Sequence, residues 1–309
     1  MAEKVKIGIG APTYNSVSRL EQLLTSLEFY KDSSFSYKIV ILDDGTPDLN
    51  KRLEVKALAN RFGVDFIQHE KNEGIPKSWN SLTNHFPDID YMLLLNDDIC
   101  ICNENFLKCA VYALDNNPKV AVVGYPLIQT DPITSLPNKN YQLPDLDSKP
   151  GRVGACVGCS FMFRKNVFLE VGMFPIWSQS FYEETFFGFE VAKRGYYSVM
   201  IPYPPIEHRG SMTFASNFEL NLTKPNPEFC SMEEYVSIMS KKYPIERIIP
   251  VKDHVYRMDY SRVVFSKILG CSDYWDKPQC EAHERWVTPL PKINFKYLNK
   301  DLQEVECEI

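Results

Sequence analysis

An apolar run that ends on two adjacent carboxylates is the feature that most constrains the fold of this chain. Residues 91–95 read Tyr-Met-Leu-Leu-Leu, and Asn96, Asp97 and Asp98 follow directly. An uninterrupted apolar run of this length is typical of a strand that is buried on both faces of a sheet. In open α/β sheets, ligands bind at the carboxyl ends of such strands. The sequence therefore predicts a place where a divalent cation could be held against a phosphate.

Two earlier segments repeat this arrangement of an apolar strand that ends in a polar turn. Residues 5–10 predict a strand that runs into a Pro-Thr-Tyr-Asn turn at 12–15, before leucines at helical spacing. Residues 37–42 predict a second strand, which ends in Asp-Asp-Gly-Thr at 43–46. Strands that finish in polar turns before helices are typical of an α/β nucleotide site.

Length, charge and cysteine content limit the number of domains and the classes of partner that this chain can have. The 309 residues suffice for one large α/β domain with an appendage or for two small domains. The net charge of −6 gives no general attraction to nucleic acid or to an anionic membrane. No apolar segment approaches the roughly 18 to 20 residues that span a bilayer, so we expect a soluble, cytoplasmic protein. We expect the nine cysteines to be buried thiols, because Cys156 and Cys159 have no second pair at zinc-knuckle spacing.

The alternation of strands and helices continues along the chain. Before residue 125 it predicts a strand at 65–67, a helix at 75–85 and a strand at 119–124, and a proline-rich stretch at 126–151 then predicts irregular structure. Beyond this stretch the pattern predicts, in order, a strand at 156–163, helices at 165–171 and 181–195, a strand at 197–201, a polar turn at 207–211 and a helix at 231–242. We expect an α/β domain over residues 1–219 and a helical, aromatic-rich appendage over residues 220–309.

The order of these motifs resembles that of family 2 glycosyltransferases, from about residue 5 to residue 215. On the donor side the matching positions are Pro12, Thr13, Tyr14 and Asn15 in the first turn, Asp43 and Asp44 in the second, Asn72, Gly74 and Asn80 around a helix entry, and Asn96, Asp97 and Asp98 at the DxD position. Later matches are the strand from Gly154 to Arg164, the Glu183–Glu184 pair followed by Gly195, and the turn with His208 and Ser211. Each motif alone is weak, but seven in one order are specific.

The resemblance implies a GT-A fold, which is an α/β/α sandwich with a mixed central sheet. It also implies an inverting enzyme that uses a nucleotide-diphospho-sugar, with Mn²⁺ or Mg²⁺ to neutralise the leaving group. Asp98 and His208 are the implied ligands, and a histidine nitrogen favours Mn²⁺. Asn96 stands where the family often has a carboxylate, so we expect Asn96 or Asp97 to contact ribose or metal-bound water. Taken alone, His208 could equally be a turn histidine bonded to the backbone.

The resemblance further implies Glu184 as the general base, with Glu183 in reserve. It implies that Asp44 accepts a hydrogen bond from the nucleotide base, most often uracil, which favours a UDP-type donor. Judged from the residues alone, the glutamate pair could instead be favourable charge at a helix N-terminus. Asp43 and Asp44 could likewise be ordinary turn residues.

The acceptor and two other functions stay open. Residues 241–267 carry seven basic and three acidic side chains, which fits either a solvated face or a phosphate-bearing acceptor. Such an acceptor could be a glycan, a lipid-linked sugar, another hydroxyl-bearing molecule or even modified DNA. A nucleotidyltransferase would also end strands on carboxylates, but the first turn lacks the basic residue of its phosphate loop. A noncatalytic nucleotide- or carbohydrate-binding protein would keep the fold without the base.

Overall fold

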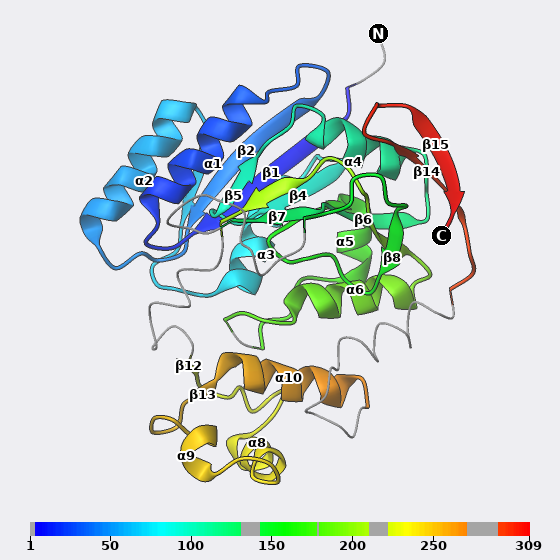
Figure 1. The fold of residues 1–309 in the computed structure, drawn as a ribbon. Helices are drawn as coiled ribbons and strands as arrows, with labels where there is room; N and C mark the ends of the chain where they lie inside the picture. Colours follow the sequence, from blue (N-terminus) through cyan, green and yellow to red (C-terminus); the bar gives the residue numbers. More distant parts are fainter. Residues whose placement is uncertain (1–3, 131–142, 178, 210–221, 271–289) are drawn as a thin grey trace.

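A mixed sheet of eight strands forms the centre of the computed structural model, which describes residues 4–130, 143–177, 179–209, 222–270 and 290–309 (Figure 1). The strand order is β3-β2-β1-β4-β9-β6-β10-β8. The first four are parallel, whereas β9 runs antiparallel to both neighbours and β8 runs antiparallel to β10. The strands are β1 Lys6–Thr13, β2 Ser36–Asp43, β3 Asp65–Gln68, β4 Tyr91–Leu95, β6 Val120–Gly124, β8 Gly151–Val153, β9 Ser160–Arg164 and β10 Tyr197–Met200. The predicted mixed central sheet is confirmed.

Strand β4 shows why the sequence needs an uninterrupted apolar run at this position. Tyr91, Leu93 and Leu95 belong to one buried cluster, while Met92 and Leu94 belong to the other. Successive side chains of a strand point to opposite faces, so each face of β4 meets its own layer of helices. The first face is covered by α1 Val17–Phe29, α2 Leu49–Phe62 and α4 Phe106–Asp115, and the second by α3 Ile75–His85, α5 Lys165–Val171 and α6 Glu183–Lys193.

A second, three-stranded sheet adjoins the carboxyl end of β4. It has the order β5-β11-β7, with β5 Ile99–Ile101, β11 Ile206–His208 and β7 Leu127–Gln129. The polar turn predicted at 207–211 is therefore wrong for Glu207 and His208, which are paired strand residues. Ile206 is buried in the core, and the chain is held on both sides by ladder hydrogen bonds that the local sequence does not reveal. Residues 210 and 211 lie outside the described residues.

The C-terminal part of the chain packs on the sheet domain in two places. The elements β12 Leu222–Thr223, α8 Met232–Met239, α9 Ile245–Ile248, β13 Val255–Tyr256 and α10 Arg257–Ile268 form a unit whose core includes Trp177 and Tyr182 from the segment before α6. The hairpin of β14 Asn294–Leu298 and β15 Glu304–Glu308 packs on α4, where Asn117 exchanges hydrogen bonds of 2.8 and 2.9 Å with the main chain of Lys296. Figure 1 shows the helical unit and the hairpin at different ends of the molecule. The boundary predicted at 219/220 lies outside the described residues.

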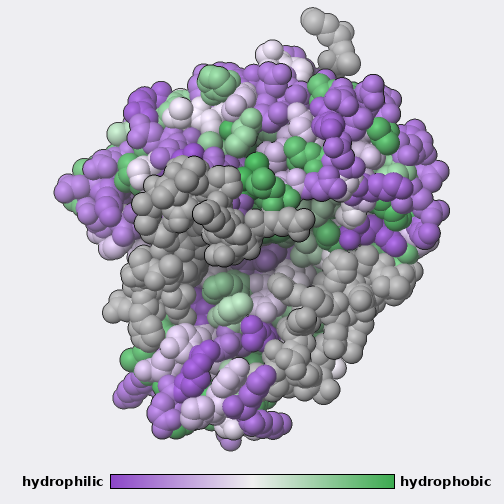
Figure 2. Space-filling model, in the orientation of Figure 1, coloured by the Kyte–Doolittle hydropathy of each residue, from purple (hydrophilic) through white to green (hydrophobic). Residues whose placement is uncertain are grey.

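The surface on the face shown in Figure 2 is mainly hydrophilic, over the sheet domain as well as over the helical unit. Apolar side chains are instead gathered in three buried clusters, two in the sheet domain and one under α10. None of the helices in the described parts of the chain has the length and apolarity that a bilayer crossing needs.

Candidate active site

The carboxyl ends of β1, β2 and β4 bring the predicted donor-side turns together. Thr13 pairs with Asp43 in the parallel ladder, and the Thr13 hydroxyl donates a hydrogen bond of 2.6 Å to Asp97 Oδ2. The main-chain N–H of Asn15 donates to Thr46 Oγ1 over 2.8 Å, which joins the first turn to the second. These turns lie side by side because β1, β2 and β4 are parallel, and parallel strands end at the same edge of a sheet.

Asp44 organises the loop that follows β3. Its Oδ1 accepts hydrogen bonds from His69 Nδ1 at 2.8 Å and from the Glu73 N–H at 2.9 Å, and its Oδ2 accepts one from the Gly74 N–H at 2.8 Å. A carboxylate oxygen has about two lone pairs, so one lone pair on Oδ2 is left for a ligand. Gly74 has φ +90°, and a side chain there would meet Gln179 Cα at 2.5 Å.

The side-chain amides of Asn80 and Asn72, both near this loop, differ in their hydrogen bonding. Asn80 donates to the Phe174 carbonyl and accepts from the Phe174 N–H, both over 2.9 Å, and it is buried. The Asn80 amide therefore clamps the segment before α6, which is a structural role that the sequence did not predict. Asn72 Oδ1 is also buried, but it has no hydrogen-bond partner among the described residues.

Arg257 reaches this edge from the helical C-terminal unit. Its side chain is 5% exposed, and its Nε donates to the Leu222 carbonyl over 3.0 Å. Burial lowers the pKa of its guanidinium to about 10, and the nearby Asp44 and Tyr14 oppose this shift. Sequence reasoning counted Arg257 only in the basic stretch 241–267, since nothing local indicates that it meets residues some 200 positions away.

Asp98 and His208 approach each other closely. Asp98 Oδ2 lies 3.4 Å from His208 Nε2, and the Gln129 amide oxygen lies 2.8 Å from His208 Nδ1. The proton of a neutral imidazole then sits on Nδ1, where it is donated to Gln129, and the lone pair of Nε2 points toward the carboxylate. In that tautomer the two lone pairs repel; a proton on Nε2 turns the contact into an ion pair, and a bound cation would bridge the two atoms. The antiparallel pairing of His208 with Ile99, next to Asp98, produces this geometry.

Buried oxygens around this pair lack partners. Among the described residues, neither Asp98 Oδ1 nor Asn96 Oδ1 has a hydrogen-bond partner, and both atoms are buried. Burial and the charge of Asp98 raise the pKa of Asp97 to about 7, while the hydrogen bond from Thr13 opposes the shift. Oxygen ligands and one imidazole nitrogen form a donor set that suits Mn²⁺ or Mg²⁺. The residues present thus fit the divalent cation that the sequence predicts.

The glutamate pair lies at the start of α6. Glu183 is 5% exposed and its Oε2 has no hydrogen-bond partner among the described residues. Burial and the charge of Glu184 raise the pKa of Glu183 well above its usual range. Burial also raises the pKa of Glu184 to about 7, although the N–H groups of Glu184 and Thr185 at the helix start oppose this.

The candidate base, Glu184, and the candidate cation ligand Asp98 both lie close to the loop before β9. A side chain on Gly158 would come within 3.2 Å of Glu184 Cδ, so glycine leaves the space in front of this carboxylate open. Burial raises the pKa of the next residue's thiol, Cys159, and the charges of Asp98 and Glu184 raise it further. The Cys159 carbonyl also accepts a hydrogen bond of 2.9 Å from the Asn96 N–H. Asp98 and Glu184 therefore flank the same short loop.

Two aromatic residues that precede the Glu183–Glu184 pair have an unusual backbone conformation. Phe181 has φ +80° and Tyr182 has φ +68°, a region that non-glycine residues rarely occupy. Such conformations cost about 1–3 kcal/mol each and persist only where the surroundings fix them. Here α10 supplies the support, through Arg262 Nε donating to Tyr182 Oη at 3.4 Å and Ser261 Oγ donating to the Ser180 carbonyl at 3.2 Å.

Comparison with known proteins gave a family and a fold. Residues 9–172 match the family described as Glycosyl transferase family 2. TarS residues 1–349 from S. aureus match with a TM-score of 0.52 and 18% identity, over 66% of this chain and 60% of that one. Mannosyltransferase PcManGT from Pyrobaculum calidifontis, solved with GDP-Man and Mn²⁺, matches with a TM-score of 0.56 and 13% identity, over 88% of this chain and 66% of that one. A comparison with curated protein sequences gave no match.

This chain spans less than two thirds of the length of TarS 1–349 and about two thirds of that of PcManGT. At these sequence identities the structural matches show the fold alone. The family match covers just over half of the sequence and contains both polar turns and the Asn96–Asp98 motif. With its mixed sheet of the GT-A type, this chain belongs to glycosyl transferase family 2.

Proposed function

We propose that this protein is a metal-dependent, inverting glycosyltransferase that moves a sugar from a nucleotide-diphospho-sugar to an acceptor hydroxyl. The observation that carries the proposal is the close approach of Asp98 Oδ2 and His208 Nε2, 3.4 Å apart, beside the buried Asp98 Oδ1, which has no hydrogen-bond partner among the described residues. Asp98 and His208 would hold Mn²⁺ or Mg²⁺, with Asn96 and Asp97 contacting ribose or metal-bound water. When bound, the ion neutralises the charge that develops on the diphosphate.

Glu184 is the proposed general base. It takes the proton from the acceptor hydroxyl as that oxygen attacks the anomeric carbon from the face opposite the diphosphate. A pKa of about 7 suits this role, because the carboxylate is available at neutral pH and still basic. Glu183 keeps its proton more firmly, since it is more deeply buried, and it is the reserve candidate.

The nucleoside is proposed to bind over the turns at 12–15 and 43–46. The remaining lone pair of Asp44 Oδ2 can accept from a base N–H, which keeps a UDP-type donor as the first choice. The guanidinium of Arg257 lies near Asp44 and Tyr14 and has only its Nε–H engaged among the described residues. Its free amino groups can donate to a keto oxygen of the same base.

For the acceptor, we favour a glycan or a lipid-linked sugar over a phosphate backbone such as DNA. Two cations of the 241–267 stretch are paired inside the helical unit. Arg247 pairs with Asp259 at 3.0 Å, and Lys267 pairs with Glu234 at 2.8 Å. Those side chains support the structural interpretation of the basic stretch.

The testing experiment is calorimetric titration of the protein with UDP, GDP and other nucleoside diphosphates, in Mn²⁺ and in EDTA. We expect one of them to bind only with the metal, and Asp98→Asn to abolish that binding while leaving the melting temperature within a few degrees. The near-isosteric Asp115→Asn is the matched control, because Asp115 ends α4 and accepts a hydrogen bond from Tyr91, at the opposite end of β4. Metal-independent binding, or none, would contradict the proposal.

A second assay separates the proposed activity from the two alternatives. With a sugar nucleotide and acceptor, a glycosyltransferase releases a nucleoside diphosphate, whereas a nucleotidyltransferase acting on a nucleoside triphosphate releases pyrophosphate. We expect Glu184→Gln to stop turnover and to leave nucleotide affinity within about twofold. Unchanged turnover would remove Glu184 from the reaction, and loss of both properties would point to a structural role.

A further inference from the structure

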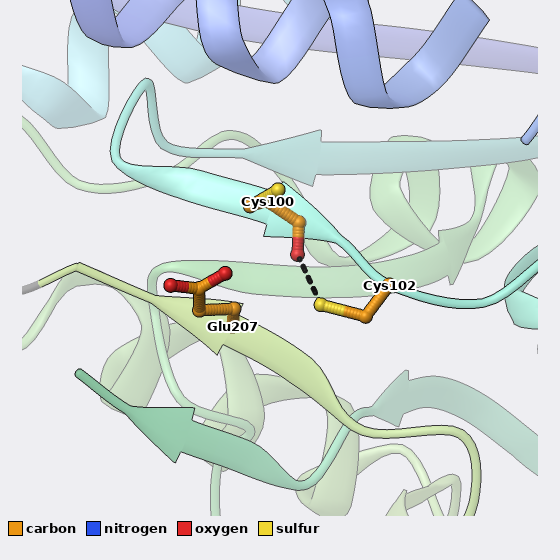
Figure 3. A group of neighbouring side chains, drawn as sticks. All are labelled: Cys100, Cys102 and Glu207. Carbon is orange, nitrogen blue, oxygen red and sulfur yellow. Dashed lines mark hydrogen bonds between the residues drawn. The ribbon is translucent and has the colours of Figure 1, made fainter. Parts of the chain in front are cut away.

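The three-stranded sheet carries a second group of metal-ligating side chains. Cys100 is the middle residue of β5, Cys102 follows the end of that strand, and Glu207 of β11 pairs with Cys100 in the antiparallel ladder. One ligand atom from each of the three lies within 4.8 Å of the others. Figure 3 shows the three side chains on these two neighbouring strands, with the Cys102 thiol donating to the Cys100 carbonyl over 3.4 Å.

Strand alternation separates this group from the candidate active site. Glu207 and His208 are consecutive in β11, so their side chains point to opposite faces of the small sheet. His208 shares its face with Gln129, to which it is hydrogen-bonded, and with the buried Ile206. The face with Glu207 and Cys100 is therefore a distinct site, although both are built on the same strands.

We propose that Cys100, Cys102 and Glu207 bind a thiophilic divalent cation of the Zn²⁺ class, separate from the cation at Asp98 and His208. Two thiolates and a carboxylate suit Zn²⁺ and exclude Mg²⁺, which prefers hard oxygen ligands. Zinc–sulfur bonds are about 2.3 Å long, so the three atoms need to approach by roughly 1 Å. Cys102 is exposed and lies beyond the last residue of β5, so its side chain can make that adjustment.

The carboxylate of Glu207 is already oriented by its neighbours. Arg209 donates from Nε to Oε1 at 3.0 Å and from Nη2 to Oε2 at 3.2 Å, and the Thr130 hydroxyl donates to Oε1 at 3.0 Å. One lone pair of Oε2 is left for a metal. Two thiolates and Glu207 carry three negative charges, which a divalent ion together with Arg209 neutralises. Such partners behind a ligand fix its direction and raise metal affinity.

A cation here would tie β5 to β11. Asp98 directly precedes β5, and His208 is the last residue of β11. Bound Zn²⁺ would therefore hold the spacing between the two candidate ligands of the catalytic cation without touching either. This makes the cysteine site a stabilising element of the active-site edge.

The test uses the full chain, reduced and freed of metal, titrated with Co²⁺. Thiolate ligation to Co²⁺ gives a near-ultraviolet charge-transfer band, whereas ligation by Asp98 and His208 gives none. We expect this band to saturate at one equivalent, to disappear on addition of Zn²⁺, and to persist in Asp98→Asn. We expect Cys102→Ser to weaken Co²⁺ binding at this site by at least tenfold and to remove most of the band.

Cys307→Ser is the matched control, because Cys307 is a half-buried thiol in the C-terminal hairpin. Its band should equal that of the unmodified protein. Since Cys102 is exposed, Cys102→Ser should keep the melting temperature of the metal-free protein, which verifies folding. No charge-transfer band, or an undiminished band in Cys102→Ser, would overturn the proposal. These readouts do not depend on the proposed glycosyl transfer.

Discussion

The ring of Tyr182 stacks on the ring of Phe265, with 5.6 Å between their centroids and 26° between their planes. Tyr182 is the residue before the Glu183–Glu184 pair, and Phe265 lies in α10. The stack thus joins the helical C-terminal unit to the left-handed backbone that aims the candidate base. We infer that this unit serves catalysis by holding the start of α6 in place.

Replacing Phe265 with leucine should therefore lower kcat more than donor affinity. Without the ring, Tyr182 can leave its strained conformation, and Glu184 loses its fixed direction. We expect kcat to fall about tenfold, with the Kd for the nucleotide changed less than twofold. Phe295→Leu is the control, because Phe295 is equally buried but lies in the hairpin. Both variants should lose about 1–3 kcal/mol of stability. If kcat falls equally in both, the loss reflects general destabilisation.

Gln129 is predicted to be a positioning residue for the cation. Its amide oxygen accepts from His208 Nδ1, so it fixes the imidazole with Nε2 toward Asp98. Gln129→Leu should weaken Mn²⁺ binding by about 10- to 100-fold, the usual effect of losing such a partner. Gln129→Glu should restore affinity, since a carboxylate also accepts from Nδ1. The measurement is Mn²⁺ titration followed by electron paramagnetic resonance, and equal affinities in all three proteins would refute the assignment.

The parts of the fold that the sequence predicted are those with a local periodic signal. The helix expected at 75–85 is α3, with its bounds as predicted, and the helix expected at 165–171 is α5. The run at 91–95 is β4 because a strand buried on both faces has no polar position. By contrast, β7 and β8 fall at the edges of the stretch predicted to be irregular, since three-residue strands are too short to show alternation.

The candidate site residues divide in the same way, into those that a local sequence signal marks and those that only the tertiary structure brings together. The positions of Thr13, Asp97 and Asp98 at the carboxyl ends of β1 and β4 were predictable because both strands begin as recognisable apolar runs, whereas their roles toward a ligand stay predictions. The partner of His208 was not predictable, because Gln129 lies in β7, 79 residues away, and only strand pairing brings them together. Arg257 was missed for the same reason. The structural role of the Asn80 side chain was not predictable, because an amide that clamps a main chain and an amide that contacts a ligand look alike in sequence.

Arg257 should contribute to donor binding from outside the sheet domain. Its guanidinium is buried near Asp44 and Tyr14, and its removal would take away the donors that we propose contact the nucleotide base. We expect Arg257→Gln to weaken nucleotide binding about tenfold without changing the Mn²⁺ requirement.

Lys267→Gln is the control for Arg257, because it removes one charge from the same helix. The measurement is calorimetric titration of both variants with the nucleotide, and only Arg257→Gln should bind it more weakly. Equal nucleotide affinities would place Arg257 among the purely structural residues of the helical unit.

The pH dependence of turnover should identify the base. A general base must be deprotonated, and burial raises the pKa of Glu184 to about 7. With metal and donor saturating, kcat should rise about tenfold per pH unit below pH 7 and become constant above pH 8. Glu184→Gln should remove this rise together with most of the activity. Glu183→Gln should keep it, because Glu183 holds its proton more firmly; loss of the rise in that variant would make Glu183 the base.

The Glu184 carboxyl should also lower the stability of the protein in the pH range where it is deprotonated and can act as a base. The native pKa of Glu184, about 7, lies above its ordinary value of 4.5, so the folded state binds a proton that the unfolded state releases. Its contribution to stability is complete below about pH 4.5 and is lost as pH rises through 7. Glu184→Gln stays neutral and escapes this loss, so its melting temperature should exceed that of the unmodified protein at pH 8 and by much less at pH 5. Thermal unfolding at these two pH values tests the burial of Glu184 without any substrate.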